Sequence, residues 1–227
     1  SPSAPGRHPP PPAAAAGRRS APAAALASGG RAGFLARVSA AAEWVEIAAA
    51  ALGIASVWLA ARERMLSWPL GLLNVLAYAG IFWGARLYAN AGLQVGYLLL
   101  NALGWWRWRH GGAADLPVTR TPRRAVPLLA ASVAALSVAL YVPLARAGGT
   151  APALDATLTA ASLVAQWQLT RKRADTWAWW IAINVGYLVL LVGQGLWPSV
   201  VQYAVFLGIA VDGHRRWWRD TPGAAAT

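Results

Sequence analysis

The chain has 227 residues, of which 57% are hydrophobic and 12% are charged, a balance too apolar for an ordinary soluble domain. It contains no cysteine, which excludes disulfides, thiolate metal sites and cysteine nucleophiles. The formal net charge is +12 at pH 7, but the basic residues stand in short clusters between long apolar runs. That pattern is typical of membrane-protein loops and argues against a nucleic-acid partner.

Residues 1–40 form a Pro/Ala-rich tail that cannot build a core, and we predict that it is disordered. Seven apolar segments follow, each about long enough to cross a bilayer. They lie at 43–61, 68–85, 87–106, 125–145, 153–170, 177–194 and 197–213. The predicted fold class is therefore an all-α integral membrane protein with seven transmembrane helices.

Arginine and lysine predict the orientation of these helices. The loops and the chain end on one side carry 13 of these residues, whereas the other side carries 4 close to the helices. Because cytoplasmic loops are enriched in basic residues, the richer side is predicted to be cytoplasmic. We expect a multi-pass protein of the plasma membrane with its N-terminus outside and its C-terminus in the cytoplasm.

The chain aligns with itself when it is shifted by 109 residues. The coincident pairs include Trp58 with Trp167, Trp68 with Trp177, Tyr78 with Tyr187, Gly104 with Gly213 and Trp108 with Trp217. The shift predicts two parallel three-helix repeats, 41–110 and 150–219, in a 3+1+3 arrangement. A cytoplasmic loop and a linker helix occupy 111–149, and 220–227 is a short tail. Parallel repeats are typical of transporters whose substrate site lies where the halves meet; a duplicated scaffold without transport is the alternative.

Polar side chains recur within the apolar segments, where each needs a partner or a purpose. Trp177, Trp180 and Asn184 share one helical face through their i, i+3, i+7 spacing, a face suited to a flat polar ring. The complete set of candidate substrate-binding residues is Trp177, Trp180, Asn184, Gln94, Tyr97, Asn101, Gln202 and Tyr203. Packing between helices is the alternative role for each amide. Trp180 is the stronger candidate for direct stacking, because its repeat equivalent is Gly71.

The ionisable residues add exclusions. Glu46 and Asp155 lie near outer helix ends, where complementing the helix dipole is favoured over proton coupling. Asp212 is expected to pair with a neighbouring arginine. The single lysine, Lys172, lies in a loop, which excludes a retinal Schiff base. No histidine or acid cluster falls at mid-membrane and no phosphate-loop motif is present, so we predict no metal, no cofactor and no enzyme activity.

Several stretches resemble the PnuC family of vitamin transporters over roughly residues 43–218. The family motif WxxWxxxN is matched by Trp177, Trp180 and Asn184, which follow the basic loop TRKRAD. The stretches WPLGLLN at 68–74, LQVGYLLLNALGWWRW at 93–108 and SLVAQWQLTRKRADTWAWW from Ser162 are also similar to the family.

The resemblance implies a seven-helix 3+1+3 fold, like a full-length version of the SWEET sugar transporters. It implies facilitated diffusion of an unphosphorylated vitamin, with nicotinamide riboside favoured by the motif and thiamine or riboflavin as alternatives. A cytoplasmic kinase would trap the product, so it is a functional partner beside the lipid bilayer. The alternatives from other classes are a non-transporting membrane receptor or enzyme, and a homo-oligomer is left open.

Overall fold

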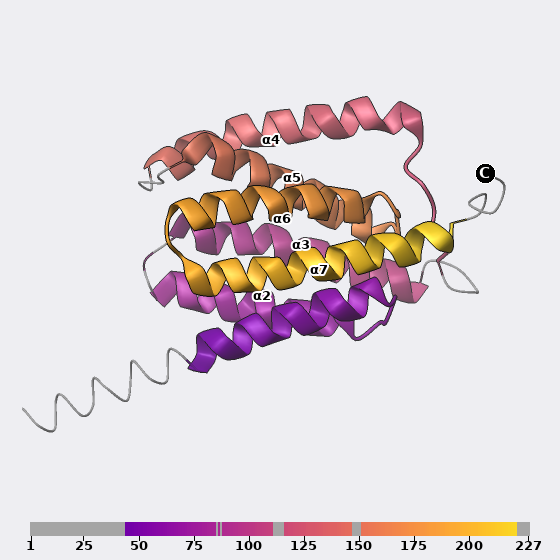
Figure 1. Cartoon of the computed structure of the whole chain (residues 1–227), viewed down its shortest axis with the longest axis horizontal. Helices are drawn as coiled ribbons and strands as arrows, with labels where there is room; N and C mark the ends of the chain where they lie inside the picture. Colours follow the sequence, from indigo (N-terminus) through magenta and orange to yellow (C-terminus); the bar gives the residue numbers. More distant parts are fainter. Residues whose placement is uncertain (1–43, 85, 87, 111–115, 147–150, 222–227) are drawn as a thin grey trace, which may run out of the picture. The chain divides into compact units, whose positions relative to one another are not determined.

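The computed structural model describes residues 44–84, 86, 88–110, 116–146 and 151–221. The predicted tail at 1–40 lies outside these residues. Within them, all seven predicted segments are helical, as Figure 1 shows. The helices are Trp44–Ala61, α2 Ser67–Gly84, α3 Tyr88–His110, α4 Val126–Arg146, α5 Pro152–Thr170, α6 Thr176–Gly193 and α7 Trp197–Arg219. A 3₁₀ turn, Arg123–Ala125, precedes α4.

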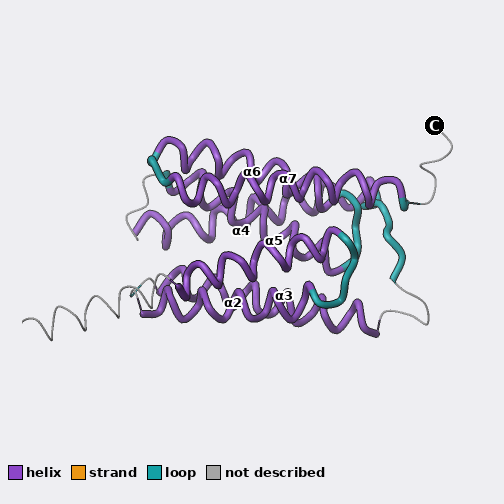
Figure 2. Tube along the Cα trace, turned by 60° about the horizontal axis from the view of Figure 1, so that its bottom comes forward, coloured by secondary structure: helices purple, strands orange, loops and turns teal. Residues whose placement is uncertain are grey.

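The helices after Trp44 pack as a bundle in which α2 lies against α3 and α6 lies against α7 (Figure 2). The central element is α5, which contacts α3, α4 and α6 and has most of its side chains buried. By contrast, Leu129 is the buried residue of α4, so this helix presents most of its apolar surface outward. A helix that is apolar all round suits a lipid-facing position.

Three helices are long and apolar enough to cross a membrane by length and composition alone, within the described residues: Trp44–Ala61, Arg123–Arg146 and Thr176–Gly193. The sequence predicts seven crossings. The other four helices are less apolar than the three that meet this criterion. Helices α2, α3, α5 and α7 carry asparagine, glutamine, tyrosine and hydroxyl side chains that line an internal cavity.

Two helices are longer than their apolar runs predict. The apolar runs end near residues 106 and 213, whereas α3 continues to His110 and α7 to Arg219. The last turns carry arginine and tryptophan, which do not interrupt backbone hydrogen bonding. The end of each apolar run therefore marks where the apolar environment ends, and α3 and α7 continue beyond it.

One end of the bundle carries Arg62, Arg171 and Arg216 and is called the arginine-rich end. Four buried tryptophans form a cluster there. Trp68 and Trp108 meet edge to face with ring centroids 5.1 Å apart, and Trp177 and Trp217 do the same at 5.5 Å. The centroids of Trp108 and Trp217 are 6.1 Å apart, which joins the two pairs into one tryptophan cluster. This edge-on geometry is the favoured one for aromatic pairs.

A loop fastens this end of the bundle. The Thr119 amide donates to the carbonyl of Lys172 at 3.0 Å, and the Ala174 amide donates back to Thr119 at 2.9 Å. The backbone of Thr121 donates to the Asp175 carboxylate at 2.5 Å. The segment before α4 is thus held against the α5–α6 loop.

Candidate functional site: an uncharged cavity between the helices

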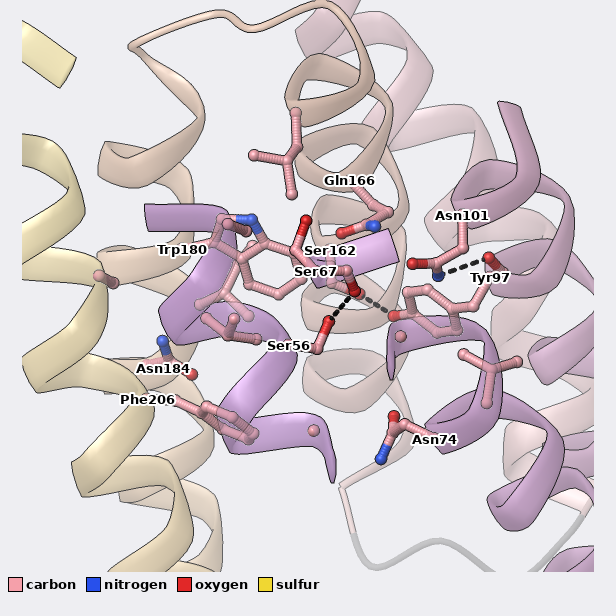
Figure 3. Close-up of a pocket in the computed structure, with 18 of the residues that line it drawn as sticks. Ser56, Ser67, Asn74, Tyr97, Asn101, Ser162, Gln166, Trp180, Asn184 and Phe206 are labelled. Carbon is pink, nitrogen blue, oxygen red and sulfur yellow. Dashed lines mark hydrogen bonds between the residues drawn. The ribbon is translucent and has the colours of Figure 1, made fainter. Parts of the chain in front are cut away.

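A cavity of about 270 Å³ lies inside the bundle and is lined by the first helix and by α2, α3, α5, α6 and α7. None of its lining residues is charged. The polar residues that line it are Ser56, Ser67, Asn74, Gln94, Asn101, Ser162, Gln166 and Asn184, together with Tyr78, Tyr97, Tyr187 and Tyr203. Figure 3 shows polar groups from several helices facing this common space. Hydroxyl and amide groups supply both donors and acceptors.

The structure brings seven of the eight predicted site residues to this cavity. Helix α6 contributes Trp177, Trp180 and Asn184, α3 contributes Gln94, Tyr97 and Asn101, and α7 contributes Tyr203. Gln202 is not among the lining residues; its side chain lies near Tyr78, which does line the cavity. Consecutive helix positions point about 100° apart, so Gln202 and Tyr203 cannot share one face.

The two tryptophans of the α6 motif have different surroundings. Trp177 is 1% exposed and packs against Trp217 and the backbone of Gly213, where an added Cβ would be 2.7 Å from its ring. Trp180 is only partly buried, lines the cavity and is labelled beside it in Figure 3. Trp180 is therefore the aromatic face available to a bound ring, while Trp177 mainly supports the end of the cavity.

Opposite this aromatic wall, Gly71 opens a polar one. An added Cβ at Gly71 would lie 2.5 Å from Oδ1 of Asn101 and 3.0 Å from Oγ of Ser56. The Asn101 amide donates to the Tyr97 carbonyl at 2.8 Å, which leaves its oxygen directed elsewhere. The Asn74 amide donates to the Ala49 carbonyl at 2.6 Å. The two amides of this wall, Asn74 and Asn101, are therefore held in place by bonds to backbone carbonyls.

Three other amides lack such anchors. Within the described residues, the side chains of Gln94, Gln166 and Asn184 have no hydrogen-bond partner, although all three line the cavity. Asn184 is 4% exposed and Gln166 is 9% exposed. None of their polar atoms is among the fully buried atoms without a partner, so these atoms can be reached from the cavity. These amides are thus the groups best placed to bind a polar ligand.

A hydroxyl network borders the cavity on the α5 side. Tyr97 and Ser162 share a hydrogen bond between α3 and α5, and Ser162 also donates to the Thr159 carbonyl at 2.8 Å. The Tyr187 and Thr159 hydroxyls are 3.1 Å apart. The ring centroids of Tyr187 and Tyr203 lie 4.9 Å apart, so α6 and α7 meet here. These contacts hold the tyrosine rings at fixed positions along the wall.

Sequence reasoning missed the α5 contribution. Thr159, Ser162 and Gln166 repeat the i, i+3, i+7 spacing of the other two polar faces, and the last two line the cavity. That spacing was the available signal. Ser56 and Ser67 offered none, because a single serine in a membrane helix carries no pattern in the sequence.

Taken together, the fold and the site define a helical membrane protein with an internal cavity for a small, flat, polar solute. An aromatic plate, free amides and hydroxyls favour a neutral or singly cationic ligand, whereas a phosphate group would require arginine or lysine. Polar and aromatic side chains around a cavity between membrane helices are an arrangement typical of solute carriers.

Comparison with known proteins identifies the family. The chain belongs to the family described as nicotinamide mononucleotide transporter, which matches residues 43–219. It is 27% identical over 202 residues to the nicotinamide riboside transporter PnuC of Escherichia coli K12, covering 77% of this chain and 84% of that protein. It is 24% identical over 181 residues to the riboflavin/roseoflavin transporter RibM of Streptomyces davaonensis, with the same coverages.

A solved structure agrees on the fold. The crystal structure of the vitamin B3 transporter PnuC superimposes with a TM-score of 0.62 at 23% identity, covering 78% of this chain and 81% of that one. The predicted family is therefore confirmed, and the family and its structural neighbour are transporters rather than enzymes. The family assignment and the apolar helices together make this chain a membrane protein.

Proposed function

We propose that this chain is a facilitative transporter of an unphosphorylated B-vitamin, with nicotinamide riboside as its substrate. The observation that carries the proposal is the uncharged cavity that holds both an aromatic face and free amides. Nicotinamide riboside combines a cationic pyridinium ring, a carboxamide and a ribose. A cation over a tryptophan face gains about 0.5–2 kcal/mol, and the free amides match the carboxamide and the hydroxyls.

The same cavity argues against two related substrates. A mononucleotide, named in the family description, carries a phosphate that needs basic partners, and the cavity has none. Riboflavin, named for the RibM relative, carries a three-ring system and a ribityl chain. Ligand pockets span about 300–1,000 Å³, and a cavity of about 270 Å³ is just below that range. A single ring with one sugar fits this size better.

Within this proposal, Trp180 stacks on the pyridinium ring, and Asn184, Gln94 and Gln166 bind its carboxamide and ribose. Tyr97, Asn101 and Tyr203 complete the wall, while Trp177 and Gln202 support it from behind. The support is that Trp180, Asn184, Gln94 and Gln166 line the cavity and have no hydrogen-bond partner within the described residues. Trp177 packs against Trp217, and Gln202 lies near Tyr78 outside the cavity lining.

The proposal includes the 3+1+3 repeat, 41–110 and 150–219, with α4 as linker. Contacts that recur at the repeat offset support it. The Arg62 guanidinium lies 3.8 Å from the ring centroid of Trp58, and the equivalent Arg171 lies 4.1 Å from that of Trp167. The edge-to-face pairs of the tryptophan cluster are equivalents as well. Alternating access would then be motion of one half against the other around the cavity.

The orientation remains the one that the basic residues predict, with the arginine-rich end of the bundle in the cytoplasm. No carboxylate or imidazole lines the cavity, so the transport step itself has no evident proton carrier. Net uptake would then depend on removal of the product inside the cell, which phosphorylation by a cytoplasmic kinase provides.

The test is uptake of radiolabelled nicotinamide riboside into proteoliposomes that contain the purified chain, with no ion gradient imposed. Unlabelled nicotinamide riboside should compete, whereas nicotinamide mononucleotide, thiamine and riboflavin should not at equal concentration. Empty liposomes provide the background. Competition by the mononucleotide as strong as by the riboside, or uptake that needs an ion gradient, would refute the proposal. Competition by riboflavin alone would identify riboflavin, and not nicotinamide riboside, as the substrate.

A further inference from the structure

The arginine-rich end of the cavity is closed by side chains that belong to two distant parts of the chain. Trp68 and Trp177 line the cavity, and Trp108 and Trp217 lie behind them in the tryptophan cluster. All four rings are at most 8% exposed. A solute that leaves the cavity at this end must pass through the cluster, so the cluster has to separate.

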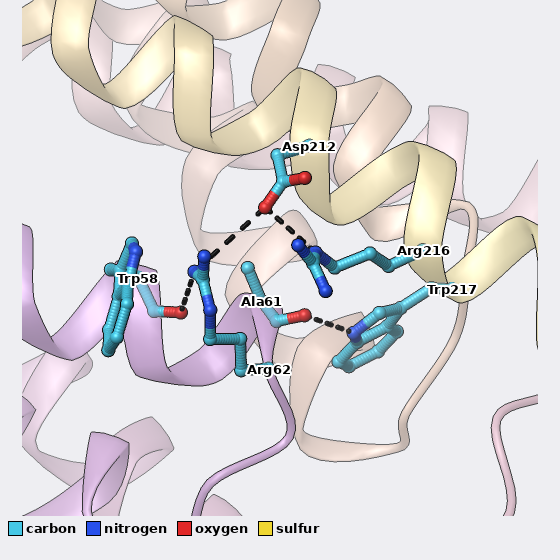
Figure 4. Close-up of polar contacts among 6 residues, drawn as sticks. All are labelled: Trp58, Ala61, Arg62, Asp212, Arg216 and Trp217. Carbon is cyan, nitrogen blue, oxygen red and sulfur yellow. Dashed lines mark hydrogen bonds and ion pairs between the residues drawn. The ribbon is translucent and has the colours of Figure 1, made fainter.

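Two hydrogen bonds join tryptophans of the cluster to backbone carbonyls in the other half of the chain. The indole N–H of Trp108, on α3, donates to the Leu169 carbonyl of α5 at 3.3 Å. The indole N–H of Trp217, on α7, donates to the Ala61 carbonyl of the first helix at 3.2 Å, as Figure 4 shows. Each half of the chain thus binds the end of a helix in the other half.

An arginine–aspartate contact lies beside these bonds. Asp212 accepts from Arg216 at 2.9 Å, which confirms its predicted pairing, and Arg62 of the first half approaches the same carboxylate at 3.9 Å (Figure 4). The three side chains are partly exposed, so water weakens this contact. It joins the halves only loosely.

The strong charged contact is deeper. The Lys172 ammonium and the Glu63 carboxylate are 2.8 Å apart; the lysine side chain is 6% exposed and the glutamate side chain, at the rim, is 30% exposed. The ammonium also lies 4.7 Å from the ring centroid of Trp108. Because a buried charge depends on its partner, this ion pair is tied to the closed arrangement of the cluster.

Glu63 and Lys172 occupy equivalent positions. They are 109 residues apart, which is the offset of the sequence repeat. Both have a left-handed backbone, with φ of 55° and 48°, although neither is glycine. The equivalent loops therefore adopt the same unusual turn, and each turn presents its side chain toward the other half.

The closed cluster also leaves polar groups unsatisfied. The indole N–H groups of Trp68 and Trp177, which are repeat equivalents, have no acceptor among the described residues. Their partners in the cluster, Trp108 and Trp217, do have acceptors. An unmet buried donor disfavours the state that buries it, so hydration of these two groups would favour an open cluster.

From these contacts we propose that Glu63 and Lys172 form the latch that closes the cavity at its arginine-rich end. The ion pair holds the tryptophan cluster together, and its separation opens the path by which the solute leaves. The inference rests on the proposed transport function and adds two functional residues that do not touch the substrate. The equivalence of the two positions explains why the latch lies where the two halves meet.

The first experiment measures how often the arginine-rich end opens, and it needs no substrate. The natural chain has no cysteine, so Ser67→Cys introduces a single thiol into the cavity wall. The Ser67 hydroxyl has no hydrogen-bond partner among the described residues, so the exchange removes no bond. Labelling by a membrane-impermeant thiol reagent, applied from the arginine-rich side of oriented vesicles, measures how often that end is open.

In the Ser67→Cys background, Lys172→Met and Glu63→Gln should each raise the labelling rate by about tenfold or more, because one charge loses its buried partner. The double exchange Glu63→Lys with Lys172→Glu should return the rate toward the starting value. Arg64→Met is the matched control, since it removes a cation from the same loop outside the ion pair. Unchanged labelling in both single variants, with a monodisperse elution profile, would overturn the latch.

A second arm connects the latch to flux. Glu63→Cys with Lys172→Cys, bridged by a short bifunctional thiol reagent that a reductant can cleave, should lose uptake and regain it on reduction. Full uptake by the bridged protein would also overturn the proposal. If the unmodified chain takes up no nicotinamide riboside, the proposed function fails, whereas the labelling experiment still decides whether the latch exists.

Discussion

The ring of Trp68 lies directly on the backbone of α3 at Gly104, where an added Cβ would be 2.0 Å from Cη2 of the indole. The equivalent pair has the same relationship, with an added Cβ at Gly213 2.7 Å from the Trp177 ring. Tryptophans can meet in a cluster at this end of the bundle because glycine lets the neighbouring helix approach.

Gly104→Ala should destabilise the protein by about 1–3 kcal/mol, because the new methyl group overpacks a rigid ring. Gly92→Ala on the same helix is the matched control, since nothing lies within 4 Å of its added Cβ. Alanine in a helix is favoured over glycine by about 0.5–1 kcal/mol, so the control should melt at or above the parent temperature. Fluorescence-detected size exclusion after heating measures both, and equal melting of the two variants would contradict the packing argument.

Trp180→Ala should weaken substrate binding by about 2 kcal/mol, or roughly 30-fold, because the cavity loses its exposed aromatic face. Trp180→Phe should retain part of the affinity. Trp106→Ala serves as control, because Trp106 is 61% exposed on the outside of α3. Isothermal titration in detergent or concentration-dependent uptake provides the measurement. Equal affinities for the Trp180→Ala and Trp106→Ala proteins would remove Trp180 from the site.

Gly71→Ala should reduce affinity about tenfold, or about 1.4 kcal/mol, while leaving the fold intact. Its Cβ would force the Asn101 side chain away from its present position, since the two would be 2.5 Å apart. Gly80→Ala on the same helix meets nothing within 4 Å and should behave as the parent. Uptake kinetics at several concentrations separate an affinity change from lost protein. A Gly71→Ala protein with normal affinity would show that the polar wall does not contact the substrate.

Thr176→Val should lower stability by about 1–2 kcal/mol, because the nearly isosteric valine removes a buried hydrogen bond that joins α6 to the Ala165 carbonyl of α5. Thr176 is 0% exposed, and its hydroxyl donates to that carbonyl at 2.7 Å. Thr157→Val is the matched control, as the Thr157 hydroxyl makes a 2.8 Å bond of the same kind at an exposed position. Melting temperatures compared in one detergent provide the measurement, and a larger loss at Thr157 would reverse the burial argument.

Asp155→Asn should leave uptake of nicotinamide riboside nearly unchanged and insensitive to a pH gradient. Asp155 lies in the first turn of α5 and its carboxylate is 3.5 Å from the Tyr187 hydroxyl, outside the cavity lining. Its expected contribution is the interaction with the helix dipole, about 0.3–1 kcal/mol of stability. Uptake with and without an imposed pH gradient checks this. Gradient-driven uptake that disappears in Asp155→Asn would identify the residue as a proton carrier instead.

Much of the site was predictable because helical spacing is a local property. The i, i+3, i+7 pattern of Trp177, Trp180 and Asn184 selects one face before any packing is known. The same rule locates Gln94, and it would have found Gln166 had it been applied to α5. The rule also separates Gln202 from its neighbour Tyr203, because consecutive helix positions point about 100° apart and Tyr203 takes the cavity-facing one.

The amino-acid order alone determined the helices, the family and the polar faces, because these depend on hydrophobic runs and on short-range periodicity. Only the tertiary structure decided which amides are satisfied and which are free, since that depends on the packing around each one; Asn74, for example, donates to the Ala49 carbonyl of another helix. It also separated the roles of the two motif tryptophans: Trp177 packs into a cluster, and Trp180 faces the cavity. The contact between Glu63 and Lys172 likewise needed the fold, because residues 109 positions apart meet only when the two halves pack together.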